Sequence, residues 1–100
     1  MKKILLVCSA GMSTSLLVNK MKDAAKSSGE EVEINALAIA ECSSVINDVD
    51  IVLLGPQVRF QKPQVEKLTN GSIPVEVIDM RQYGVMDGKG ILESTLSKIK

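Results

Sequence analysis

Four stretches of the chain have the hydrophobic pattern of β-strands. Residues 4–7 (ILLV) and 50–54 (DIVLL) contain continuous apolar runs with branched side chains, which is typical of strands buried on both faces of a parallel sheet. Residues 32–37 (VEINAL) and 75–78 (VEVI) alternate in part between apolar and polar positions, so one face of each is expected to meet water. The pattern predicts two central strands and two edge strands.

Helical spacing of apolar residues occurs between and after these strands. A helix is predicted from about residue 13 to residue 28, with its stop at Gly29, because four apolar side chains fall on one face: Leu17, Met21, Ala24 and Ala25. A last helix is predicted from a stripe that we expect to be core rather than interface: Leu92, Leu96 and Ile99. Weaker helical patterns cover residues 42–46 and 58–68.

This order of strands and helices predicts an α/β fold, with a doubly wound four-stranded parallel sheet between two helical layers. Because crossover connections are right-handed and the first and third strands look central, the economical strand order is 2-1-3-4, as in flavodoxin-like three-layer folds. The 100 residues fit one domain, spanning positions 1–100. Ligands of such sheets bind beyond the carboxyl ends of the strands at the switch point, which lies between strands 1 and 3.

Three connections are predicted to converge at that switch point. Cys8 directly follows the first strand, residues 55–57 follow the third, and Asp79 follows the fourth. Gln57, Asp79 and Tyr83 are therefore candidates for lining a crevice around Cys8. The alternative is that these residues, and Asp87 with them, have only structural roles, since residues of these types also end strands, cap helices and pack against connecting segments.

The segment after the first strand has the composition of a phosphate-binding loop. Apart from Met12, its side chains are small or carry a hydroxyl, so the backbone can approach a bound group and direct N–H groups towards it. Such a nest at a helix N-terminus suits a tetrahedral oxyanion such as phosphate, and Cys8 adds a nucleophile beside it. The alternatives are burial of Cys8 as a small apolar residue and helix capping by the hydroxyl groups. The predicted cradle consists of Ser9, Ala10, Gly11, Met12, Ser13, Thr14 and Ser15.

The absence of certain residue types limits the reactions that the segment around Cys8 could catalyse. The chain has no histidine, and residues 4–19 include no charged side chain, so this segment offers neither a general base nor an arginine clamp. A cysteine phosphatase with C-x5-R spacing would need arginine where Thr14 stands, which favours holding a phosphoryl group over hydrolysing it. Nucleotide-binding motifs fail as well: residues 84–90 are one residue short of Walker A spacing, and no GxGxxG follows the first strand.

Charge and cysteine content disfavour other classes of protein. Twelve basic and twelve acidic residues give a formal net charge of zero, so no overall field attracts nucleic acid. Cys8 and Cys42 form no CxxC pair, and no phosphate-like loop adjoins Cys42, which we expect to be unreactive. The apolar run at residues 4–7 is too short for a signal peptide or a membrane span, so a soluble cytoplasmic protein is expected.

Four motifs, in the same order along the chain, resemble one family. Residues 8–18 (CSAGMSTSLLV), 52–57 (VLLGPQ), 74–79 (PVEVID) and 83–88 (YGVMDG) are similar to the IIB component of the lactose/cellobiose class of phosphoenolpyruvate-dependent sugar phosphotransferase systems. The resemblance runs from the first strand into the last helix.

The resemblance implies a phosphoryl carrier. In that family the cysteine after the first strand takes a phosphoryl group from a phosphohistidine of the IIA component and passes it to a sugar entering through the membrane component IIC. It implies a phosphocysteine at Cys8, no metal or organic cofactor, and a sugar that we expect to be a β-linked disaccharide. Nothing in the sequence demands more than a monomer that docks transiently on IIA and on the permease, and we expect it to dock through an apolar, mostly uncharged face around Cys8 that includes Met12. The residues alone leave open a regulatory module in which Cys8 senses oxidation or a bound anion.

Overall fold

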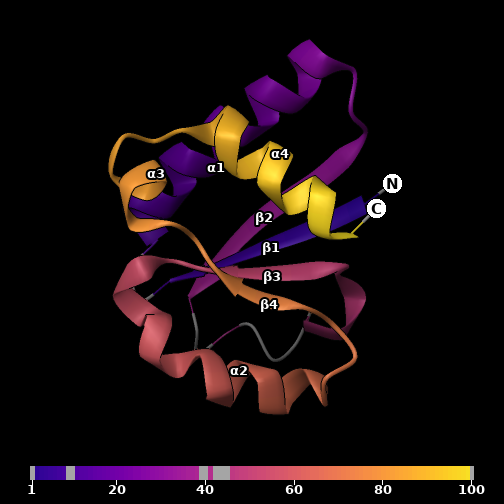
Figure 1. The fold of residues 1–100 in the computed structure, drawn as a ribbon, viewed down its shortest axis with the longest axis vertical. Helices are drawn as coiled ribbons and strands as arrows, with labels where there is room; N and C mark the ends of the chain where they lie inside the picture. Colours follow the sequence, from indigo (N-terminus) through magenta and orange to yellow (C-terminus); the bar gives the residue numbers. More distant parts are fainter. Residues whose placement is uncertain (1, 9–10, 39–40, 42–45, 100) are drawn as a thin grey trace.

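The computed structural model describes residues 2–8, 11–38, 41 and 46–99. Four strands form one parallel sheet: β1 (Lys2–Cys8), β2 (Val32–Ala38), β3 (Ile51–Leu54) and β4 (Val75–Val77). Their order is β2-β1-β3-β4, which confirms the predicted 2-1-3-4 arrangement (Figure 1). Because all strands are parallel, they end at one side of the sheet, which we call the carboxyl edge.

Helices cover both faces of the sheet. Figure 1 shows α1 (Gly11–Ser28) and α4 (Gly88–Ile99) on one face and α2 (Lys62–Thr69) on the other. The central strand β1 serves both layers, since Ile4 and Leu6 pack with α1 and α4 while Leu5 and Val7 belong to the core beneath α2. Burial on both faces explains why residues 4–7 form a continuous apolar run.

Helix α1 begins two residues earlier than predicted, at Gly11, and ends where Gly29 was expected to stop it. Gly29 has a φ of 72°, and the N–H of Glu30 donates to the carbonyl of Ala25 at 2.9 Å, a pattern that terminates a helix through a left-handed residue. The predicted apolar face is confirmed, because Leu17, Met21 and Ala25 are buried. The stripe in α4 is core as well, with Leu92 and Leu96 buried.

The helix predicted over residues 58–68 forms in two parts. The 3-10 helix η3 (Pro56–Gln61) contains a non-helical residue, Val58, and α2 follows it directly. Pro63 sits in the first turn of α2, where its missing N–H costs no intrahelical bond. Of the helix expected over residues 42–46, residues 42–45, including Cys42, lie outside the described residues; Ile46 begins a short 3-10 helix, η2 (Ile46–Asp48).

The short helix α3 (Met80–Gly84) was not predicted. Its signal was present in the sequence, because Asp79 is followed three residues later by Gln82, the spacing of an N-terminal capping box. In the described part of the chain, no helix is long and apolar enough to cross a membrane.

Candidate functional site

Cys8 lies where the sequence placed it, at the carboxyl end of the central strand β1. It pairs with Ala38 of β2, whereas the pairing of β1 with β3 ends one residue earlier, at Val7 and Leu54. Only 2% of its surface is exposed. The thiol is thus held at the switch point of the sheet, between the two strands whose connections diverge.

The N-terminus of α1 begins three residues after Cys8. The N–H groups of a first helical turn have no intrahelical acceptors, and the positive end of the helix dipole adds to their attraction for an anion. The first turn of α1 contains no acidic residue that would offset this attraction. The backbone N–H groups of residues 11–14 are therefore available as hydrogen-bond donors at the end of α1 that follows Cys8 in the chain.

The predicted cradle is only partly described. Ser9 and Ala10 lie outside the described residues, as do the side chains of residues 11–14, so the roles expected of Met12 and Thr14 rest on the sequence. Ser15 is exposed on α1. The difference from the sequence-based prediction is that Gly11 and Met12 already belong to the helix, so residues 11–15 of the cradle form its first turns.

Gly55 brings three candidate residues together. Its N–H donates to the carbonyl of Val7 at 2.9 Å, which fixes the end of β3 against β1. A β-carbon at this glycine would lie 3.6 Å from the β-carbon of Cys8, 3.7 Å from Cε2 of Tyr83 and 2.7 Å from Oε1 of Gln57. Cys8, Gln57 and Tyr83 thus meet around Gly55 although they come from β1, η3 and α3. The three side chains include no carboxylate, imidazole, ammonium or guanidinium group.

Asp79 has the structural role that the sequence left as its alternative. Its Oδ2 accepts a hydrogen bond from the N–H of Gln82 at 3.0 Å, which caps α3, and its carbonyl accepts from the N–H of Tyr83 at 2.9 Å. The residue also borders a cavity of about 210 Å³ between β4, α3 and α4, which neither Cys8 nor Gln57 lines. Asp87 likewise caps a helix, since its Oδ1 accepts from the N–H of Gly90 at 3.0 Å.

Replacing Asp79 with alanine is expected to lower the free energy of unfolding by about 1 kcal/mol, the usual cost of losing an N-cap. Urea unfolding followed by circular dichroism measures this difference. Asp79→Asn is the matched control, because the amide oxygen can still accept from the N–H of Gln82. Equal stability of Asp79→Ala and the wild type would contradict the capping role.

Sequence reasoning missed two cations at the same edge. Arg59 lies in η3, directly after β3, and Arg81 lies in α3, after β4. Both are exposed, and a guanidinium nitrogen of Arg59 donates to the carbonyl of Pro56 at 3.0 Å. The signal was present in the sequence, because Arg59 and Arg81 follow the third and fourth strands just as Gln57 and Asp79 do.

Comparison with known proteins gives one family throughout. Residues 3–94 match the family described as "PTS system, Lactose/Cellobiose specific IIB subunit". The oligo-beta-mannoside-specific EIIB component of Bacillus subtilis is 52% identical over 98 residues, which cover 97% of this chain and 95% of that protein. The lactose-specific EIICB component of Lacticaseibacillus casei is 27% identical over 88 residues, 87% of this chain and 15% of that longer protein.

Solved structures agree with this assignment. The lactose-specific IIB component domain from Streptococcus pneumoniae superimposes with a TM-score of 0.88 over 99% of this chain and 98% of that one, at 19% identity, which supports the fold. The cellobiose-specific IIB component from Borrelia burgdorferi has a TM-score of 0.81 at 41% identity, over 98% of this chain and 91% of that one. With a family match that spans nearly the whole chain and a relative 52% identical to it, this protein belongs to the lactose/cellobiose-specific IIB subunits of the sugar phosphotransferase system, the transferases of a sugar transport pathway.

Proposed function

We propose that this IIB subunit carries a phosphoryl group on Cys8, receiving it from a phosphohistidine of a IIA component and passing it to a sugar bound by the permease IIC. The observation that carries the proposal is the position of Cys8, a buried thiol at the switch point, three residues before the N-terminus of a long helix without acidic residues in its first turn. Residues 1–100 act as one such IIB unit, a monomer that docks transiently.

The first transfer exchanges one bond for another. The S–P bond of the phosphocysteine forms as the N–P bond to the donor imidazole breaks, and the thiol proton passes to the imidazole that leaves. The chain has no histidine of its own, so the donor ring must come from the partner. The N–H groups at the start of α1, within the segment from Ser9 to Ser15, stabilise the phosphoryl oxygens, with no metal or organic cofactor.

The two carboxylates that follow β4 support storage over hydrolysis. Phosphocysteine hydrolysis needs a base that activates water. The two carboxylates that follow β4, Asp79 and Asp87, instead accept hydrogen bonds from helix N-termini. We therefore expect the phosphoryl group to stay on Cys8 until a second partner arrives.

The second partner, IIC, and the sugar that accepts the phosphoryl group are inferred from the relatives. The EIICB relative from Lacticaseibacillus casei is matched over 15% of its length by this chain, which supports a partnership between IIB and IIC and a position at the cytoplasmic face of the membrane, beside the permease. The most similar relative described above is named for oligo-beta-mannosides, and one solved relative for cellobiose. We therefore propose a β-linked sugar, such as a disaccharide, as the final acceptor.

Intact-mass measurement tests the carrier function. The subunit is incubated with a IIA component of the lactose/cellobiose class that has been phosphorylated on its histidine, and we expect it to gain the mass of one phosphoryl group. A second IIB subunit serves as the positive control for the donor. If that control gains the mass and this protein does not, the carrier function is wrong and the sensing alternative gains support.

Gln57 is expected to stabilise the transferred group from the side opposite α1. Its carboxamide folds back over Gly55, beside Cys8, and an amide can donate to a phosphoryl oxygen without adding charge. Replacing Gln57 with alanine should slow phosphoryl acceptance about tenfold, the effect of losing one hydrogen bond in the transition state. The time course of the mass gain measures the rate. Gln64→Ala, on the exposed side of α2, is the matched control, and an unchanged rate in Gln57→Ala would rule out this role.

A further inference from the structure

Exposed apolar side chains gather at the carboxyl edge. Leu16 on α1 is 50% exposed, Phe60 in η3 72%, Met80 at the start of α3 63% and Val85 after α3 71%. The elements that carry them follow β1, β3 and β4, and Figure 1 shows α3, η3 and the start of α1 at the same end of the sheet. Large exposed apolar residues that share one surface are typical of a protein-binding site.

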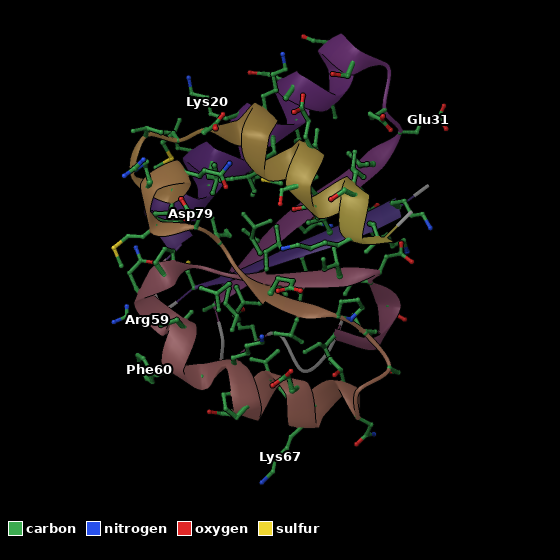
Figure 2. All side chains as sticks on the ribbon, in the orientation of Figure 1. Lys20, Glu31, Arg59, Phe60, Lys67 and Asp79 are labelled. Carbon is green, nitrogen blue, oxygen red and sulfur yellow. The ribbon has the colours of Figure 1, made fainter. Side chains whose placement is uncertain are left out.

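Two arginines accompany these apolar residues, and we call the set of six the Cys8 rim: Leu16, Arg59, Phe60, Met80, Arg81 and Val85. Figure 2 shows Arg59 and Phe60 extending from η3 at this edge. Within the described ranges, neither Arg59 nor Arg81 forms an ion pair. The nearby carboxylates of Asp79 and Asp87 cap helix N-termini, whose dipoles compensate part of their negative charge.

The opposite edge of the sheet carries charges of both signs. Four carboxylates lie just before β2 and β3, the amino ends of these strands, and Figure 2 shows one of them, Glu31, at the end of the molecule away from Arg59. These four residues are Glu30, Glu31, Asp48 and Asp50. Lysines share this edge, since Lys2 and Lys3 open β1 and Lys26 lies in the last turn of α1, so they offset these carboxylates.

We propose that the Cys8 rim is a charge-selective docking surface that binds the phosphorylated form of IIA in preference to the spent form. The proposal rests on the carrier function above. The rim's apolar residues offer contact area to the part of IIA around the donor histidine, and Arg59 and Arg81 attract the two negative charges of its phosphoryl group.

The same charges promote release after transfer. Once the S–P bond has formed, the phosphoryl group belongs to the IIB side and offsets the two arginines. The IIA component has at that moment lost its negative charges, so the electrostatic attraction between the products is weaker than that between the reactants. The arginines thus favour encounter with a loaded donor and departure of an empty one.

The rim's composition favours a protein over a membrane as its occupant. Surfaces that bind anionic lipid carry four to eight clustered Lys or Arg. The rim has two arginines among four apolar side chains, with two carboxylates beside it. An apolar centre flanked by arginine is characteristic of protein interfaces.

Binding to Cys8→Ala tests the proposal, because this variant cannot accept the group and the loaded donor stays loaded. We expect phosphorylated IIA to bind it at least about tenfold more tightly than unphosphorylated IIA at low salt. The difference should shrink in about 1 M salt, where the Debye length is about 3 Å. Titration calorimetry measures both affinities. Equal affinity for the two forms at low salt would overturn the proposal, as would the absence of binding to either.

Charge reversal identifies the groups responsible. In the Cys8→Ala background, Arg59→Glu with Arg81→Glu should abolish the preference for phosphorylated IIA, whereas Lys26→Glu with Lys67→Glu should keep it, because those lysines lie in the last turns of α1 and α2. Figure 2 shows Lys67 extending from α2 away from the sheet. If the arginine variant retains the preference while wild-type Cys8 still gains phosphoryl mass, this inference is wrong and the carrier function stands. A wild type that gains no mass defeats the carrier function and this inference with it.

Discussion

Replacing Cys8 with alanine is expected to abolish phosphoryl acceptance by this IIB subunit. The thiol supplies the only sulfur nucleophile at the end of β1, and the chain has no histidine to replace it. The variant should fold, because alanine fits a site where Cys8 is a small buried residue, and the loss of one sulfur atom costs roughly 1 kcal/mol of unfolding free energy. Intact mass after incubation with phosphorylated IIA should show no gain over hours in which the wild type is fully loaded.

Two further variants make this result specific. Cys42→Ala should accept the phosphoryl group at the wild-type rate, because no phosphate-like loop adjoins Cys42 in the sequence. Cys8→Ser should be as inactive as Cys8→Ala, since a serine hydroxyl is a weak nucleophile without an adjacent base. A mass gain in Cys8→Ala would move the acceptor to a hydroxyl or carboxylate elsewhere and remove Cys8 from its proposed role.

The strands could be predicted because each face of a strand lies in a single environment, either core or water, along its length. In β1, successive side chains point to two cores, so both faces exclude polar residues and the apolar run is unbroken. In β2, one edge is unpaired and Glu33 and Asn35 are exposed, which produces the alternation. Once two central strands are identified, the handedness of the crossover connections allows few strand orders, and 2-1-3-4 is the simplest of them.

Short elements escaped prediction for a physical reason. Helix α3 has five residues, less than two turns, so it cannot show the recurrence of apolar positions on which helix prediction depends. Its only buried side chain is Tyr83. The capping residue Asp79 was the signal in the sequence for this helix. It also fitted a residue that lines a crevice, because a helix cap and a crevice residue can both be a carboxylate at the end of a strand.

The strand ends at which the site residues lie could be predicted from the sequence, but the contacts between their side chains could not. The sequence placed Cys8 and Gln57 at the ends of neighbouring strands, and the structure has them there. That Gly55 lies between them, with the ring of Tyr83 on its open side, depends on how α3 turns back towards β3. The arginines of the Cys8 rim were missed for the same reason, since Arg59 and Arg81 are 22 positions apart and come to the same edge of the sheet only through the order of the strands.

The position of α1, and with it of the proposed phosphate cradle, depends on a close approach to α4. Gly88, the first residue of α4, is buried against Lys20 in the middle of α1. A β-carbon at Gly88 would lie 2.6 Å from the carbonyl carbon of Lys20, 2.7 Å from its β-carbon and 2.8 Å from its carbonyl oxygen. Two of these atoms are backbone, so no side-chain rotation can relieve the overlap.

Replacing Gly88 with alanine is therefore expected to lower the free energy of unfolding by about 3 kcal/mol, the upper end of the range for overpacking a core. Urea unfolding followed by far-ultraviolet circular dichroism measures the loss. Gly84→Ala is the matched control: a β-carbon at this exposed glycine has no atom within 4 Å, and we expect its stability to change by less than about 0.5 kcal/mol. Because α4 must move away from α1 to admit the methyl group, Gly88→Ala should also load Cys8 more slowly than Gly84→Ala. Equal midpoints of urea unfolding for the two variants would show that α1 is not held by this contact.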